Sequence, residues 1–112
     1  MTPTPERIDD IAIVTIPGKS LESANSRAFK ESMAPVVAAN PKLVFDLSQL
    51  TFVDSSGLGA ILSCLRQANA AGGDLKLCGL SKGVRALFEL VRMHKIFEIL
   101  NTREEAVRAF GG

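Results

Sequence analysis

The chain has 112 residues, of which 46% are apolar and 22% are charged, and its formal net charge is +1. This length and apolar content predict one folded domain, residues 1–112, and exclude disordered and low-complexity classes. A nearly neutral chain has no strong field to attract nucleic acid or an anionic membrane, and we expect neither as a partner.

No export or membrane signal is recognisable in the sequence. The segment Met1–Glu6 lacks the basic and apolar parts of a signal peptide, and no apolar run approaches the ~20 residues that span a bilayer. We therefore expect a cytoplasmic protein.

The residues that usually carry metal or redox chemistry are scarce. Cys64 and Cys78 stand among apolar neighbours at a spacing that matches no zinc or redox motif, and we expect both to be reduced core residues. His94 is the only histidine and is expected to be partly exposed in a loop. No metal and no other cofactor is expected.

The first part of the chain predicts a strand and a helix. After an irregular start over about residues 1–6, the β-branched run 11–16 predicts a strand. The apolar spacing over about residues 21–39 predicts an amphipathic helix. Pro35 lies inside this stretch, and we expect the helix to kink or end near Ala34.

The middle of the chain predicts two strands with a helix between them. The run 43–47 has almost no polar alternation and predicts a central strand that is covered on both faces. Apolar spacing over residues 58–68 predicts a second helix, closed by Gly72-Gly73. Alternation over residues 75–79 predicts the next strand.

Capping residues mark two helices in the last part. Ser81 is placed to cap a helix with an apolar stripe over residues 84–91, and residues 96–99 predict a short last strand. Thr102 and Glu105 have the spacing of a capping box before a fourth helix. The alternating order predicts an α/β domain with one central mixed sheet of about four to five strands and about four helices packed on it.

One segment, Phe52–Gly59, could carry chemistry because it places a carboxylate and two hydroxyls at a helix start. The simplest interpretation is an N-cap by Asp54 or a serine. Gly57 and Gly59 then allow close packing of the first turn or a positive φ. A second interpretation is a regulatory phosphoserine, with the phosphate bonded to the N–H groups of Gly57 or Leu58.

Two enzymatic interpretations of this segment fail. A serine nucleophile would require a glycine at position 53 and a nearby His–acid pair, but the chain has Val53 there and His94 lies in another element. No Lys-Ser/Thr follows Gly59, so a phosphate-binding loop is also excluded. We do not expect an enzyme.

The sequence resembles the STAS-domain anti-sigma factor antagonists of bacteria over about residues 7–110. Four stretches carry the resemblance: Leu43–Ser48, Thr51–Gly59, Gly72–Leu77 and Val84–Phe88. The most specific element is the motif D-S-S-G-L-G, which follows the apolar strand and the residues D-L-S. It implies a single STAS-like domain in which the first serine of the motif, Ser55, is phosphorylated. Spacing alone does not choose between Ser55 and Ser56.

The resemblance also implies a partner-switching function. Unphosphorylated, such a protein binds an anti-sigma factor that is also a serine kinase; phosphorylated on Ser55, it is released, and a serine phosphatase restores it. The partner-binding residues are expected within one segment: Asp54, Ser55, Ser56, Gly57, Leu58 and Gly59. Alone, the protein is expected to be a monomer, because its apolar residues are accounted for by helix stripes and strands.

The alternative is a constitutive STAS scaffold subunit of a sensor complex or lipid transporter, without a phosphorylation switch. The chain departs from the family pattern at residues 18–22 and at Pro35. Asp46, at the end of the central strand, either positions the phosphorylated serine or caps the next turn. Three basic side chains are expected on solvated helix faces: Arg66, Lys82 and Arg85.

Overall fold

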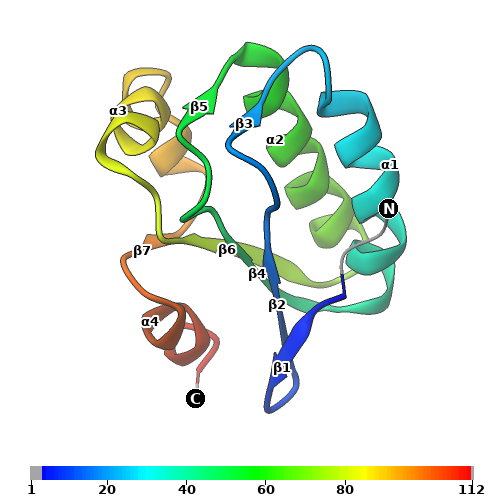
Figure 1. Ribbon diagram of the computed structural model, residues 1–112. Coiled ribbons are helices and arrows are strands. Elements are labelled where there is room, and N and C mark those ends of the chain that lie inside the picture. The colour runs from blue at the N-terminus through cyan, green and yellow to red at the C-terminus, as the bar shows by residue number, and fades with distance from the viewer. Residues whose placement is uncertain (1–3, 112) are drawn as a thin grey trace.

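The computed structural model describes residues 4–111, which form a five-stranded sheet with helices on both faces (Figure 1). The expected α/β class, the mixed sheet and the four α-helices are confirmed. The strands are β1 (Glu6–Ile8), β2 (Ile11–Thr15), β3 (Ser20–Leu21), β4 (Lys42–Asp46), β5 (Phe52–Val53), β6 (Asp74–Cys78) and β7 (Ile99–Leu100). The helices are α1 (Ser26–Ala39), α2 (Ser55–Ala70), α3 (Lys82–Leu90), the 3₁₀ helix η1 (Met93–Lys95) and α4 (Arg103–Arg108).

The sheet has the order β1-β2-β4-β6-β7, so β4 is central, as expected from its unbroken apolar run. Strand β1 pairs with β2 in the antiparallel sense, and the other neighbours are parallel. β3 and β5 pair separately as a short parallel ribbon. This ribbon lies beside the start of α2 (Figure 1).

Alternating side chains of the strands supply two cores. Ala12 and Val14 of β2 lie in the larger core with side chains of α1, α2 and α3. Ile11 and Ile13, one residue out of phase, lie in the smaller core, which α4 closes with Ala106. A strand turns successive side chains to opposite faces, so both faces of β2 and β4 are buried.

Two capping predictions are confirmed. The hydroxyl of Ser81 accepts a hydrogen bond from the N–H of Val84, and that of Thr102 accepts one from the N–H of Glu105. The carboxylate of Glu105 accepts from the N–H of Asn101, one residue before the position that a standard capping box uses.

Helix α1 differs from its prediction at its start and at Pro35. It begins at Ser26 instead of Leu21, which pairs in β3. It continues through Pro35 to Ala39, the end that the apolar spacing predicted, so the alternative that the helix ends near Ala34 is wrong. Pro35 lies on the exposed side of α1, where water can satisfy the carbonyl group that proline leaves without a donor.

Three further expectations need correction. The expected irregular start over residues 1–6 ends earlier, since Glu6 already pairs in β1; residues 1–3 lie outside the described residues. The last strand comprises Ile99 and Leu100, whereas Ile96 follows η1. Val91, expected inside the α3 stripe, is the exposed C-cap residue of α3. No helix within residues 4–111 is long and apolar enough to cross a membrane.

Candidate functional site

The site predicted from the sequence lies where β5 meets α2. Asp54 is the N-cap residue of α2, and its Oδ1 accepts a hydrogen bond from the N–H of Gly57 at 2.9 Å. Ser55 and Ser56 are therefore the first two residues of the helix, and both are exposed. The capping interpretation is confirmed, with Asp54 as the capping residue.

Asp54 also connects this helix start to a distant loop. Its Oδ2 accepts from the N–H of Ser23 at 3.1 Å, and its own N–H donates to the carbonyl of Leu21 at 3.3 Å. Both carboxylate oxygens thus accept hydrogen bonds from backbone N–H groups. This arrangement holds the turn before α1 against the start of α2.

The hydrogen bonds at the helix start correct one expectation. The N–H of Gly57 is bonded to the Asp54 carboxylate, and the N–H of Leu58 is bonded to the Asp54 carbonyl at 2.9 Å. Within residues 4–111, the backbone N–H groups of Ser55 and Ser56 have no hydrogen-bond acceptor. A phosphate at this helix start would therefore accept hydrogen bonds from the N–H groups of Ser55 and Ser56, not from those of Gly57 and Leu58.

The two glycines of the segment have different roles. A Cβ on Gly57 would overlap the carbonyl oxygen of Leu21, so only glycine allows α2 to approach β3 this closely. A Cβ on Gly59 would meet nothing within 4 Å. The expectation of close packing is thus confirmed for Gly57. For Gly59 it is wrong, and the alternative of a positive φ is wrong for Gly59 as well.

The six predicted binding residues divide by exposure. Ser55, Ser56 and Gly59 face solvent, and Asp54 is half-buried. Gly57 and Leu58 are buried and contribute to the surface only through the backbone that they position. The exposed part of the segment therefore consists of two hydroxyl groups and a bare stretch of helix backbone.

Asp46 acts away from this segment. Its Oδ1 accepts from the N–H of Ser48 at 2.9 Å, which confirms the turn-capping alternative, and its Oδ2 pairs with Nε of Arg103 at 2.7 Å. Burial alone would raise the pKa of Asp46, but the hydrogen bonds from Arg103 and Ser48 outweigh it and hold that pKa below its ordinary value. Arg103 also pairs with Glu6, so α4 is anchored to β1 and β4.

The two cysteines are free and buried, as expected. Desolvation raises the pKa of Cys64 to about 12 and that of Cys78 to about 11. Neither thiol is therefore a nucleophile near neutral pH.

The remaining polar candidates are not gathered into a site. Arg66 and Lys82 are exposed, as expected, while Arg85 is half-buried and donates to the side-chain oxygen of Asn101 at 3.2 Å. His94 is exposed but lies in the 3₁₀ helix η1, not in the expected loop. Within residues 4–111, no group of three or more His, Cys, Asp or Glu side chains is placed to hold a metal ion.

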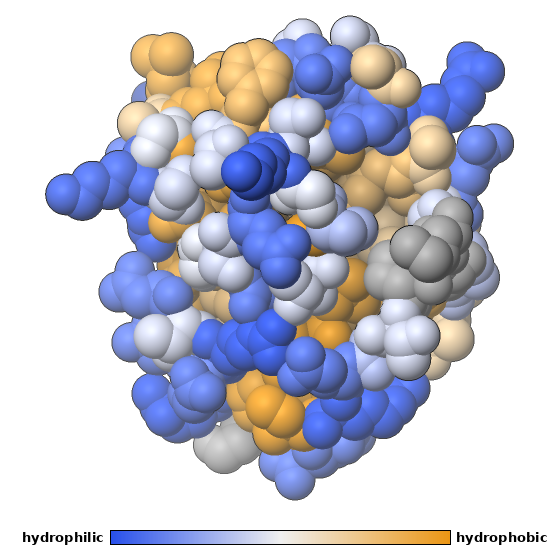
Figure 2. Space-filling model, viewed as in Figure 1, coloured by the Kyte–Doolittle hydropathy of each residue, from blue (hydrophilic) through white to orange (hydrophobic). Residues whose placement is uncertain are grey.

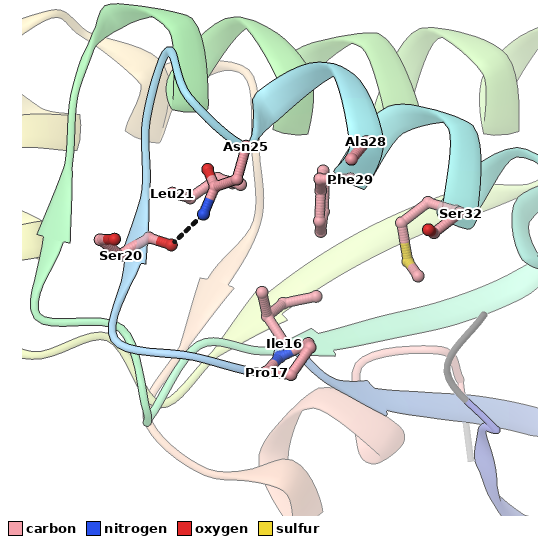
Figure 3. A pocket seen from close by; sticks show the side chains of 9 residues that line it. Ile16, Pro17, Ser20, Leu21, Asn25, Ala28, Phe29 and Ser32 are labelled. Carbon is pink, nitrogen blue, oxygen red and sulfur yellow. Dashed lines mark hydrogen bonds between the residues drawn. The ribbon is translucent and has the colours of Figure 1, made fainter. Parts of the chain in front are cut away.

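A pocket of about 170 Å³, which the sequence did not indicate, lies between α1 and the chain after β2. Phe29 of α1 and Ile16 point into it from opposite sides, and Asn25 donates a hydrogen bond to the carbonyl of Ser20 at its edge (Figure 3). The pocket is lined mainly by apolar groups: Ile16, Pro17, Ser20, Leu21, Asn25, Ala28, Phe29, Ser32 and Met33. The Ser20–Asn25 wall is the same segment that Asp54 holds through Ser23.

Comparisons with known proteins identify this architecture. The STAS domain model matches residues 2–106, which defines the class of domain. The Bordetella bronchiseptica protein BtrV, described as an anti-sigma factor antagonist, is 33% identical over 108 residues, covering 96% of this chain and 92% of BtrV. The chain belongs to the STAS-domain family of anti-sigma factor antagonists.

Two further relatives agree with this assignment. The anti-sigma-B factor antagonist of Bacillus subtilis (strain 168) is 26% identical, with 85% of this chain and 86% of that protein covered. The crystal structure of an anti-sigma factor antagonist from Mycobacterium paratuberculosis matches with a TM-score of 0.83 at 25% identity, covering 96% of this chain and 92% of the other. The family resemblance drawn from the sequence is confirmed.

Proposed function

We propose that this protein is an anti-sigma factor antagonist whose binding is switched off by phosphorylation of Ser55. The observation that carries the proposal is the exposed hydroxyl of Ser55 at the first position of α2, directly after the capping Asp54, in a chain of this family. In the unphosphorylated state the chain binds a cytoplasmic anti-sigma factor, which is also the serine kinase and supplies ATP. A serine phosphatase restores the binding state.

The surface around Ser55 suits a partner that approaches closely. Gly59 lies one helical turn after Ser55 on the same side of α2, and no side chain covers its backbone. The active site of the kinase could therefore enclose the Ser55 hydroxyl while another part of the same kinase packs against the α2 backbone at Gly59. This chain would contribute the hydroxyl, and its own residues would perform no catalytic step.

Phosphorylation would change the charge of this surface and leave the fold intact. It adds about 1.5–2 negative charges beside Asp54, in a position that water and the free N–H groups of Ser55 and Ser56 can solvate. In a complex, the same phosphate would be desolvated against a surface shaped for a hydroxyl. Because like charges across an interface cost several kcal/mol, we expect a loss of affinity of roughly a hundredfold or more.

The test is incubation with a cognate anti-sigma factor kinase and ATP, followed by phosphopeptide mass spectrometry. One phosphate is expected on Ser55; Ser55→Ala should abolish its incorporation, and the exposed neighbour Ser56→Ala is the matched control that should retain it. Phosphorylation confined to Ser56 would contradict the proposal.

Calorimetry separates the switch from a constitutive scaffold. Ser55→Asp should weaken binding to the kinase in part, and Ser55→Ala should bind but never be released. A phosphoprotein that binds as tightly as the unmodified chain would favour the scaffold subunit of a sensor complex or lipid transporter. A loss of affinity that is explained by unfolding in a melting curve would also contradict the switch.

A further inference from the structure

Four large apolar side chains are exposed near the start of α2, where Ser55 lies. Phe52 of β5 is 55% exposed and Leu90 of α3 is 79% exposed, and Val91 and Ile96 are exposed by about half. β5 and η1 both pack against α3. We call Phe52, Leu90, Val91 and Ile96 the β5–α3 apolar face; Figure 2 shows apolar side chains gathered over β5 and the end of α3.

The core does not require this exposure. Helix α3 turns Val84 and Phe88 inward, and Phe88 packs edge-on against Phe97 with 6.2 Å between ring centroids. Leu90 lies on the opposite side of the helix from Phe88, where a polar residue would serve the fold equally well. Single exposed apolar residues are ordinary, but a contiguous group marks an interaction surface.

The segment that carries Leu90, Val91 and Ile96 of the β5–α3 apolar face is basic. Residues 82–96 hold four basic side chains and one acidic side chain, Glu89, although the whole chain has a net charge of only +1. Within the part of the chain that the structure describes, none of the four forms an ion pair: Lys82, Arg85, Arg92 and Lys95. A matching surface would carry apolar groups and negative charge.

We propose that the β5–α3 apolar face binds an acidic, apolar segment of the same partner protein that engages Ser55, an inference that rests on the proposed function. The two surfaces adjoin along the chain, because Phe52 of β5 is followed, after Val53 and Asp54, by Ser55 at the start of α2. Phosphate on Ser55 then repels the acidic segment of the partner. An anionic membrane fits less well, since Val84 and Phe88 pack the apolar stripe of α3 into the domain core and so withhold it from a bilayer.

The probe is a synthetic helical peptide of about 18 residues with leucine on one side and glutamate on the other, titrated into the ¹⁵N-labelled protein. We expect amide shifts centred on Phe52, Leu90, Val91 and Ile96, and weaker binding when salt is raised from about 50 to about 500 mM. The same peptide with lysine in place of glutamate should not bind.

Matched variants locate the interaction. Leu90→Gln should weaken peptide binding by about tenfold, whereas Ile8→Gln, which changes an exposed apolar residue on the distant strand β1, should leave it unchanged. Lys95→Glu should weaken binding of the glutamate peptide by reversing one positive charge, without removing apolar area. Melting curves of the three variants show whether each retains the fold.

Several outcomes overturn the proposal: no binding of the glutamate peptide, shifts elsewhere, or equal binding of the lysine peptide. Binding of phosphatidylglycerol vesicles that Leu90→Gln abolishes would assign the face to a membrane, and a dimer that Leu90→Gln dissociates would assign it to a second copy of the chain.

Binding of the anti-sigma factor kinase separates this inference from the Ser55 switch. If Leu90→Gln leaves kinase binding unchanged while Ser55→Asp weakens it, the switch stands and this inference is wrong. If Leu90→Gln weakens kinase binding and Ser55 is never phosphorylated, the face stands and the switch is wrong.

Discussion

The carboxylate of Asp54 accepts a hydrogen bond from the backbone N–H of Ser23 at 3.1 Å, although 31 residues separate the two in sequence. The other oxygen of that carboxylate caps α2 through Gly57. One side chain therefore fixes both the start of α2 and the turn before α1. It also sets where Ser55 lies relative to that turn.

Replacing Asp54 should loosen this junction in two steps. Asp54→Asn keeps one side-chain oxygen, which can still cap Gly57, and loses the acceptor for Ser23. Asp54→Ala loses both bonds and should destabilise the protein by about 1–2 kcal/mol, since that is the usual cost of an N-cap. In urea denaturation, the midpoint should be highest for the wild type, lower for Asp54→Asn and lowest for Asp54→Ala. Equal midpoints for wild type and Asp54→Ala would show that the two bonds contribute nothing.

The two glycines provide a matched pair of substitutions. Gly57→Ala places a methyl group against the Leu21 carbonyl and should destabilise the fold by about 1–3 kcal/mol. Gly59→Ala enters open space in a helix and should stabilise it by up to about 1 kcal/mol.

Partner affinity distinguishes a second role for Gly59. If the bare turn after Ser55 contacts the partner, Gly59→Ala should weaken binding of the anti-sigma factor although the protein itself is more stable. Unchanged affinity would show that the interface does not use this turn. Denaturation curves and calorimetry on the same variant separate the two effects.

Local sequence signals predicted the elements that bury long runs or carry caps. The unbroken run 43–47 identified the central strand because only a strand covered on both faces buries every side chain. Ser81 and Thr102 marked helix starts because their hydroxyl groups accept nearby backbone N–H bonds. The Ser55 segment was found in the same way, from residue types at a helix start.

Contacts between distant segments escaped prediction. β3 and β5 have two residues each, too few for any periodicity, and they pair with each other beside α2, which packs against both. The exposure of Val91 could not be read from the apolar stripe, since the stripe does not show that α3 ends at Leu90 and leaves Val91 as its C-cap residue. The premise for a monomer, that no apolar side chains are left over, is therefore wrong, and the monomer itself stays a prediction.

The buried cysteines should be inert in the native protein. Because burial raises the pKa of Cys64 to about 12 and of Cys78 to about 11, almost no thiolate is present at pH 8. Ellman's reagent should label neither thiol in the folded protein and both in guanidinium chloride. We expect the double serine variant to bind its partner, and a disulfide required for binding would contradict that.

The pair of Asp46 and Arg103 should make stability depend on acid pH. The pKa of Asp46 in the folded protein lies below the ordinary value of 3.8, so the unfolded chain takes up this proton first as the pH falls. The stabilising contribution is therefore complete at neutral pH and is lost progressively below about pH 4. Arg103→Ala leaves the nearly buried carboxylate without its cation and should cost about 1–3 kcal/mol at pH 7.

The acid effect is measured by denaturation of the wild type and of Asp46→Asn between about pH 7 and pH 2.5. The variant cannot titrate at position 46, so its stability should fall less steeply below pH 4. Lys42→Gln, which breaks the exposed pair between Lys42 and Asp10, is the control and should follow the wild type closely, because exposed pairs contribute little. If the stability of the wild type and of Asp46→Asn fell equally steeply with pH, the ion pair between Asp46 and Arg103 would not be the acid-sensitive element. Other carboxylates would then govern acid unfolding.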